Sequence, residues 1–163
     1  MAQSNLERKI NLTTRQARKA ALSLNEFPTS QINKALRTMS SLLDKNRDYL
    51  KGENAKDLKA GKEKGLSPAM LDRLTLSDKT FISMKSGLKV VAALPSPFGS
   101  AYDHYTRSDK LKIHKIKVPI GVVGIIYESR PNVTVDAAAI CLKSNNAVIL
   151  RGGSEAFHSN KAL

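Results

Sequence analysis

A short segment near the C-terminal end of the sequence carries residues suited to phosphate chemistry, in the order Arg151-Gly152-Gly153-Ser154-Glu155. Paired glycines let a backbone approach a ligand closely, while a serine can cap a following helix whose free N–H groups face an anion. Arg151 adds a positive charge suited to phosphate, and Glu155 can accept hydrogen bonds from ribose hydroxyls. The segment therefore fits a nucleotide site, although an ordinary strand-to-helix turn has the same residues.

The elements that must position this segment are two strands and a helix. Residues 121–127 are almost all Val and Ile, which is typical of a strand buried on both faces in a parallel sheet. Residues 133–143 are predicted to form a helix, and residues 147–150 a second strand. Ligands of such sheets bind where strands end and helices begin, with a right-handed crossover expected between the strands. The site is therefore expected in segments 128–132 and 151–155.

The usual nucleotide fingerprints are missing, since the sequence has neither G-x-G-x-x-G nor a Walker loop. The run PIGVVGIIYESRPNVTVDAAAICLKSNNAVILRGGSEAFHSN instead closely resembles the signature region of the gamma-glutamyl phosphate reductase (glutamate-5-semialdehyde dehydrogenase) family, a branch of the aldehyde dehydrogenase superfamily. The resemblance continues upstream through GLSPAMLDRLTL and VAALPSPFG and covers essentially the whole chain.

This resemblance implies an α/β fold in which N-terminal helices are followed by part of a Rossmann-like parallel sheet of the aldehyde dehydrogenase type. Residues 1–163 would be the N-terminal part of the cofactor-binding domain, mainly helical over 1–94 and with a strand-helix-strand core over 95–163. By the same resemblance, the catalytic cysteine belongs to a later domain. We therefore expect the chain to be a fragment that is inactive alone.

The implied reaction is the NADPH-dependent reduction of L-glutamyl 5-phosphate to L-glutamate 5-semialdehyde and phosphate, in proline biosynthesis. The implied cofactor is therefore NADP(H), which Arg151, Gly152, Gly153, Ser154 and Glu155 would bind, with Arg151, Ser154 and Glu155 around the adenosine ribose. A carboxylate near the ribose usually favours the unphosphorylated cofactor, so Glu155 would favour NADH over NADPH. The positive charge of Arg151 would then determine which of the two is preferred.

The resemblance also assigns roles in the first turn. Asn132 falls where the superfamily has an amide that donates to the developing oxyanion, and the alternative is that Asn132 caps the following helix. Arg130 would bind the phosphate or carboxylate of the substrate, and Glu128 would orient Arg130. Asn145 stands where relatives commonly have glycine, and we expect it to adopt the left-handed conformation that a helix end needs.

Other chemistries find little support in the sequence. The single cysteine, Cys141, lies in an apolar stretch of the predicted helix and is expected to be a buried core thiol with a raised pKa. His104, His114 and His158 are spaced far apart without a second cysteine, so no metal site is predicted. One cysteine and no secretory signal favour a cytoplasmic protein.

The net charge of +13 raises the question of an anionic partner. Nine Lys and Arg residues fall in each of the segments 1–50, 51–100 and 101–163, so the excess is spread evenly. With few aromatic residues and no long apolar run, neither nucleic-acid binding nor a membrane span is expected. A basic interaction protein remains an alternative, and a homo-oligomer of the full-length protein is left open.

Helical periodicity predicts further elements upstream. A helix is expected over residues 6–24 with a break near Thr13 and Thr14, a second one capped by Ser30, and a third over 49–64 closed by glycines 61 and 65. Two more are expected to start at Ser67 and Ser77. Residues 111–118 hold four apolar residues among three Lys, which predicts a strand pair or an exposed strand with one solvated face.

Overall fold

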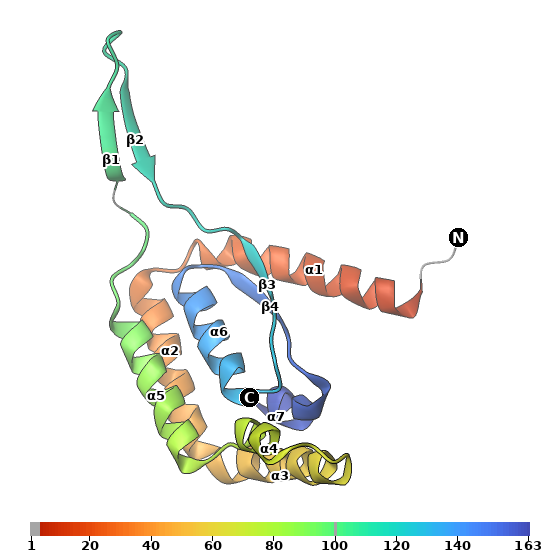
Figure 1. The fold of residues 1–163 in the computed structure, drawn as a ribbon. Helices are drawn as coiled ribbons and strands as arrows, with labels where there is room; N and C mark the ends of the chain where they lie inside the picture. The colour runs from red at the N-terminus through yellow and green to blue at the C-terminus, as the bar shows by residue number, and fades with distance from the viewer. Residues whose placement is uncertain (1–3, 100) are drawn as a thin grey trace.

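Five helices precede two small sheets, and two more helices, α6 Pro131–Lys143 and α7 Phe157–Ala162, follow within the sheet region, as seen in a computed structural model that describes residues 4–99 and 101–163 (Figure 1). The first five helices are α1 Asn5–Leu24, α2 Thr29–Lys45, α3 Arg47–Glu63, α4 Pro68–Leu74 and α5 Asp78–Ala93. Two of their starts follow directly from the sequence, because the Ser67 and Ser77 hydroxyls accept from backbone N–H groups three residues on. Both predicted starts are confirmed.

Three helix expectations are wrong in detail. Helix α1 is unbroken, because the Thr13 and Thr14 hydroxyls donate to carbonyl oxygens one turn earlier and stay satisfied inside the helix. Helix α2 begins one residue before Ser30, with Pro28 at the N-cap. Helix α3 continues through Gly61, where a Cβ would lie 2.8 Å from Leu66 Cδ1, and only Gly65 (φ +73°) follows its end. Gly61 is thus a packing residue.

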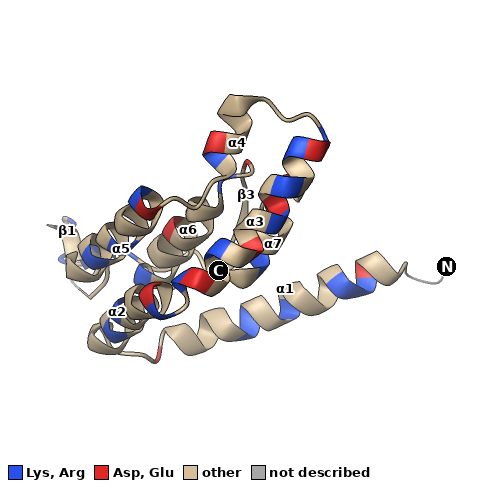
Figure 2. Ribbon diagram, turned by 90° about the horizontal axis from the view of Figure 1, so that it is seen from below, with Lys and Arg blue, Asp and Glu red and all other residues tan. Residues whose placement is uncertain are grey.

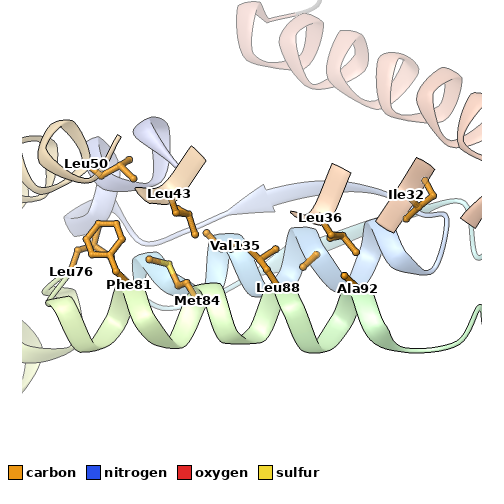
Figure 3. Packing of buried hydrophobic residues seen from close by; sticks show 11 residues of the cluster. Ile32, Leu36, Leu43, Leu50, Leu76, Phe81, Met84, Leu88, Ala92 and Val135 are labelled. Atoms are coloured by element: carbon orange, nitrogen blue, oxygen red, sulfur yellow. The ribbon is translucent and has the colours of Figure 1, made fainter. Parts of the chain in front are cut away.

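The hydrophobic core lies between α2, α5 and the later helix α6 Pro131–Lys143 (Figure 3). Apolar residues at helical spacing on each helix point into it, and several are wholly buried. The buried members are Ile32, Leu36, Leu43, Leu50, Leu76, Phe81, Met84, Leu88, Ala92, Val135 and Ala139. Burial of each large side chain contributes about 1.5–3 kcal/mol, so this cluster is the main apolar contact between the helices.

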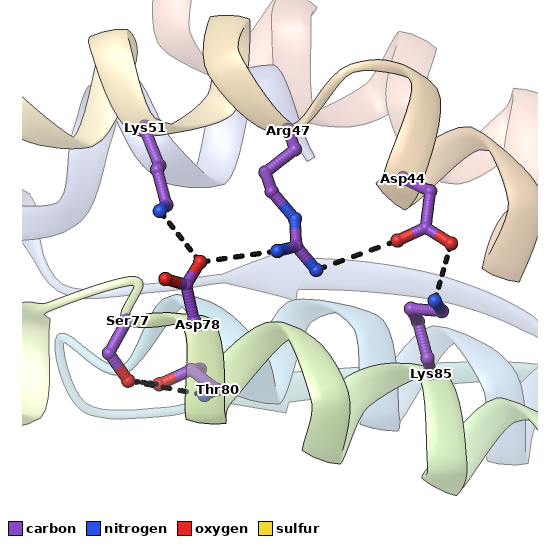
Figure 4. A network of polar contacts seen from close by, with 7 residues as sticks. All are labelled: Asp44, Arg47, Lys51, Ser77, Asp78, Thr80 and Lys85. Atoms are coloured by element: carbon purple, nitrogen blue, oxygen red, sulfur yellow. Dashed lines mark hydrogen bonds and ion pairs between the residues drawn. The ribbon is translucent and has the colours of Figure 1, made fainter.

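A row of ion pairs ties the outer sides of α2, α3 and α5 together (Figure 4). Asp44 pairs with Lys85 and Arg47, and Asp78 pairs with Arg47 at 3.2 Å and with Lys51 at 2.7 Å. Hydrogen bonds from Lys85 and Lys51 lower the pKa of the Asp44 and Asp78 carboxyl groups respectively. Because these side chains are partly or largely exposed to solvent, we expect each ion pair to add little to the stability of the fold.

The strands form two separate pairs. β1 Ala101–Thr106 and β2 Lys112–Ile116 make an antiparallel hairpin that extends away from the helices in Figure 1, so the strand pair expected around residues 111–118 is confirmed. β3 Val122–Ile126 and β4 Ala147–Arg151 pair in parallel, with Val122 opposite Ala147 and Ile126 opposite Arg151. Helix α6 connects them, which gives the predicted strand-helix-strand unit.

The predicted burial of β3 on both faces is wrong. Ile126 is 87% exposed, and Gly124 is exposed as well. The reason is topological, since β3 has β4 as its single neighbouring strand within the described residues and α1 packs mainly along β4. A run of Val and Ile is typical of a doubly covered strand, but the covering elements must also be present.

Helix α6 ends as its sequence predicts. Asn145 has φ +48°, and the backbone N–H groups of Asn145 and Asn146 donate to Leu142 O at 3.0 Å and Cys141 O at 2.8 Å. This pattern is a Schellman motif, in which asparagine takes the left-handed position usually held by glycine. The start of α6 lies two residues earlier than predicted, because Pro131 is tolerated in the first turn, where no backbone N–H partner is needed.

Candidate functional site

The two segments singled out in the sequence meet at the carboxyl ends of β3 and β4. Ser129 Oγ, after β3, donates to Glu155 Oε2, after β4, at 2.5 Å. Gly153 permits this approach, because a Cβ on Gly153 would lie 2.0 Å from Ser129 Oγ. The parallel register places both turns at one edge of the sheet, as the sequence predicted.

A pocket of about 410 Å³ opens at this edge. It is lined by Met70, Arg73, Glu128, Ser129, Arg130, Gly153 and Glu155. Four of the predicted site residues are therefore together, namely Glu128, Arg130, Gly153 and Glu155. Met70, Arg73 and Ser129 were not predicted.

The charges of the pocket are arranged around Glu128. Glu128 Oε2 lies 3.4 Å from Arg130 Nε and 3.8 Å from a terminal guanidinium nitrogen of Arg73. The Glu128–Arg130 contact agrees with the predicted proximity of the two side chains. Arg73 comes from α4, and the signal that could have found it is its place inside GLSPAMLDRLTL, one of the segments on which the family resemblance rests.

Glu155 is held as a carboxylate by neighbouring hydroxyls. The Ser129 hydrogen bond is the main cause that lowers the pKa of Glu155, assisted by the backbone and by Ser154 Oγ, which donates to Glu155 Oε1 at 3.0 Å. The predicted helix cap at Ser154 is wrong, because a 3-10 turn (η1, Ser154–Ala156) starts here with Gly153 at its N-cap and no side-chain cap. The Ser154 hydroxyl is directed to its neighbour instead.

The space where a side chain at Gly152 would lie is filled by other side chains of the protein and is not open to a ligand. A Cβ at Gly152 would lie 2.2 Å from Asn160 Nδ2 and 3.1 Å from Tyr127 Cζ. Asn160 belongs to α7 Phe157–Ala162 and accepts from Thr134 Oγ1 at 3.0 Å, and Thr134 lies 2.6 Å from Tyr127 Oη. The glycine pair thus lets β3, α6 and α7 pack closely beneath the site.

A second cavity, of about 870 Å³, lies on the α1 side of the β4 turn. Arg151, Gly152, Gly153 and Ser154 line it together with Lys9 and Lys161. The predicted cofactor segment is therefore divided, since Arg151 lines the α1-side cavity, Glu155 lines the 410 Å³ pocket, and Gly153 lines both. The Arg151 guanidinium donates to the carbonyl oxygen of Gly152.

Asn132 does not cap α6. The N-cap residue is Arg130, which makes no side-chain cap, and Asn132 lies in the first turn with Nδ2 donating to Asp136 Oδ2 at 3.3 Å. The helix starts earlier than the capping alternative requires, so that alternative is wrong. Burial raises the pKa of Asp136, and the hydrogen bond from Asn132 works against this rise.

A buried polar cluster on α3 fixes the end of the chain under the site. Asp57 accepts from the backbone N–H groups of His158 at 3.0 Å and Ser159 at 2.7 Å, and Asn54 Nδ2 donates to Ser159 Oγ at 2.9 Å. No site residue was predicted in this helix, so Asn54 and Asp57 were missed. Their signal was weak, because only the fold brings residues 54 and 57 next to residue 159.

Cys141 and the histidines complete the candidates. Cys141 is buried and burial raises the pKa of its thiol, as predicted for a core cysteine. His104 and His114 lie side by side across the hairpin with ring centroids 6.1 Å apart. Among residues 4–99 and 101–163, no three His, Cys, Asp or Glu side chains gather as metal ligands, and no helix has the length and apolar composition to cross a membrane.

Positive charge is distributed over several helices (Figure 2).

The fold and this edge define an α/β protein in which N-terminal helices precede a parallel strand-helix-strand unit, with its polar side chains at the carboxyl ends of the strands. No protein-family model matches the chain. Curated relatives do: the chain is 51% identical over 159 residues to the gamma-glutamyl phosphate reductase of Moorella thermoacetica, covering 98% of this chain and 38% of the relative. For the reductase of Geotalea daltonii the identity is 49% over 155 residues, covering 95% and 37%.

Solved structures give the same result. The crystal structure of gamma-glutamyl phosphate reductase from Thermotoga maritima superposes with a TM-score of 0.86 at 40% identity, covering 91% of this chain and 36% of that one. The Saccharomyces cerevisiae reductase gives a TM-score of 0.86 at 31% identity, covering 99% and 40%. The chain thus spans well under half of these relatives, and it resembles an N-terminal portion of gamma-glutamyl phosphate reductase. The predicted fold, helices followed by part of a parallel sheet, is confirmed.

Proposed function

We propose that the chain is the N-terminal, cofactor-side portion of an enzyme that reduces L-glutamyl 5-phosphate to L-glutamate 5-semialdehyde and phosphate with NADPH, in the cytoplasm, as part of proline biosynthesis. The observation that carries the proposal is the 51% identity to a gamma-glutamyl phosphate reductase over 98% of the chain. The polar edge at the ends of β3 and β4 supports it, because ligand sites of parallel sheets form there.

The residues at this edge suit NADP(H) in part. Arg151, Lys9 and Lys161 line the 870 Å³ cavity and would provide positive charge for the phosphate that distinguishes NADPH from NADH. Glu155 lines the 410 Å³ pocket and not the 870 Å³ cavity. Its carboxylate would therefore not lie against the cofactor phosphate that Arg151 would bind. The cofactor would supply hydride, and Gly152, Gly153 and Ser154 would contact its adenosine side.

The substrate would lie at the 410 Å³ pocket. Arg130 would bind its phosphate or carboxylate. Asn132 would donate to the oxyanion, since a side-chain amide carries two N–H groups and Asp136 engages one of them. Because hydrogen bonds aimed at developing charge act mainly in the transition state, loss of this amide would lower kcat more than it raises KM.

The nucleophile would come from outside these 163 residues. Acyl-phosphate reduction through a thioester needs an accessible thiolate. Cys141, the single cysteine of the sequence, is buried among apolar side chains and its pKa is raised, so it is a poor nucleophile. We therefore propose that the chain by itself binds cofactor without turnover. An intact mass far above 17.8 kDa for the native product in its own cell would support this, and a native product of 17.8 kDa would exclude a self-sufficient reductase.

The decisive experiment is nucleotide binding to the purified chain by isothermal titration calorimetry. We expect NADPH to bind more tightly than NADH, and Arg151→Ala to reduce the NADPH preference by about tenfold, the value of one charge-assisted contact. Arg107→Ala is the matched control, because Arg107 is an exposed arginine of the hairpin paired with Asp109 at 3.4 Å. A cooperatively folded chain that binds neither nucleotide, or an Arg151 variant that binds NADPH as the parent does, would contradict the proposal.

A further inference from the structure

Two arginines from separate elements face one carboxylate oxygen in the 410 Å³ pocket. Arg73 lies near the end of α4 and Arg130 follows β3, yet their guanidinium nitrogens lie 3.8 and 3.4 Å from the same Glu128 Oε2. All three residues line the pocket. Two guanidinium groups that converge on one anionic oxygen have the geometry that binds phosphoryl groups and carboxylates.

Glu128 is a weakly held partner. Its side chain is 71% exposed, while those of Arg73 and Arg130 are 53% and 45% exposed. Both contacts exceed the usual length of a charge-assisted hydrogen bond, and exposed ion pairs contribute little to stability. A ligand with two negative charges can therefore replace the single charge of Glu128 at small cost to the fold.

The start of α6 adds to the positive potential at this point. The helix has 13 residues, Arg130 is its N-cap, no side chain caps its first N–H groups, and its first turn holds no acidic residue. A helix start that has no side-chain cap and no acidic residue carries a partial positive charge. The second carboxylate of the pocket, Glu155, is engaged by Ser129 and Ser154, so it does not compete for the arginines in the structure.

We propose that Arg73 and Arg130 together bind a phosphoryl dianion, and that Glu128 is the counter-ion which this ligand displaces. Arg73 is then a ligand-binding residue from a helix that carries none of the predicted site residues. The source of the phosphoryl group, substrate or cofactor, rests on the proposed function. If Glu128 oriented Arg130, removing its charge would weaken phosphate binding. As a displaced counter-ion it has the opposite effect, because removing its charge leaves the two arginines free for the ligand and strengthens phosphate binding.

The test is a titration of the isotopically labelled chain with inorganic phosphate at constant ionic strength. Binding is measured by NMR from the changes in the amide chemical shifts. Arg73→Gln and Arg130→Gln are each expected to weaken phosphate binding by about fivefold or more, as expected for loss of a charge-assisted contact. Glu128→Gln is expected to strengthen it several-fold. Arg107→Gln and Asp109→Asn form the matched control pair, an exposed ion pair outside the pocket, and should leave the affinity unchanged.

Each other result is equally informative. Unchanged phosphate affinity in Arg73→Gln, or weaker binding in Glu128→Gln, would overturn the proposal. Competition between phosphate and NADPH would support it with a cofactor phosphate as the source, whereas simultaneous binding would support it with a substrate phosphate. A chain that binds phosphate through Arg73 but binds no nucleotide would support this inference and contradict the proposed function. A chain that binds NADPH but shows no Arg73-dependent phosphate binding would contradict this inference and leave the proposed function standing.

Discussion

The helical core and the parallel sheet bury their apolar residues to different extents. Leu36 and Phe81, on α2 and α5, have no exposed surface, because the apolar stripes of these helices face each other and α6. In contrast Ile126, at the end of β3, is 87% exposed. The helices are covered on their apolar sides within this chain, whereas β3 is only partly covered by the residues that the structure describes. An apolar pattern states what a segment can bury, and neighbouring segments decide what it does bury.

The largest expected difference between the two regions is in the effect of replacing an isoleucine in each of them by alanine. Ile32→Ala, in the buried α2 stripe, is expected to reduce the free energy of unfolding by about 2–5 kcal/mol through lost burial and a residual cavity. Ile126→Ala is expected to cost about 1 kcal/mol or less, mainly through strand propensity. Urea denaturation measures both values.

The control lies in α5, where Ile82 is 63% exposed beside the fully buried Phe81. Ile82→Ala is expected to change the free energy of unfolding by about 0.5 kcal/mol or less, because the site is on the surface and alanine favours a helix. A cost at Ile126 equal to that at Ile32 would mean that β3 is covered in solution, and the contrast between the two regions would fail.

The next largest effect is expected at Gly153, in the turn after β4. Gly153→Ala would place a Cβ 2.0 Å from Ser129 Oγ and 3.1 Å from the Ser129 backbone nitrogen, which must move the β3 turn away from the β4 turn. We expect a loss of about 1–3 kcal/mol, typical of overpacking. Gly124→Ala, in β3, meets nothing within 4 Å and should be close to neutral. Thermal unfolding of the two variants tests this, and equal melting temperatures would show that the two turns are not in close contact.

The accuracy of sequence reasoning follows the same division. Features fixed by neighbouring residues were predicted, such as the helix starts at Ser67 and Ser77 and the left-handed Asn145. Each depends on a hydrogen bond or a backbone angle within a few residues, so the sequence contains the whole cause. Local chemistry also misled where two local outcomes compete, because Thr13 and Thr14 can bond within a helix as well as break one.

The site shows what local reasoning cannot reach. Glu128 and Arg130 are two residues apart, and their proximity was predicted, whereas Arg73 joins them only because α4 packs beside the β3 turn. The contact between Ser129 and Glu155 likewise requires the parallel register of β3 and β4. The strand-helix-strand pattern predicted that the two turns would share an edge, but not which side chains would meet across it.

The smallest predicted effect concerns that contact and depends on pH. The Ser129 hydrogen bond is the main cause that lowers the pKa of Glu155 in the folded chain, so Glu155 binds a proton less readily when folded than when unfolded. Its contribution to stability is therefore full above the unfolded pKa of about 4.3 and is lost as pH falls through the folded pKa. Ser129→Ala should reduce the free energy of unfolding at pH 6, and this difference from the parent should shrink as the pH falls below the unfolded pKa and through the lowered folded pKa of Glu155.

Hydrogen bonds from lysine also lower the pKa of Asp44 and Asp78. We therefore expect the parent and the Ser129→Ala variant both to lose stability in acid, and only the difference between them reports on Glu155. Ser41→Ala is the matched control, since the Ser41 hydroxyl donates to the Arg37 carbonyl oxygen and touches no carboxylate. Its difference from the parent should be constant between pH 6 and about pH 3, because no titrating group loses a partner. If the Ser129 difference were equally constant, Glu155 would not be stabilised as a carboxylate by the β3 turn, and the link between the two turns of the site would be one of shape alone.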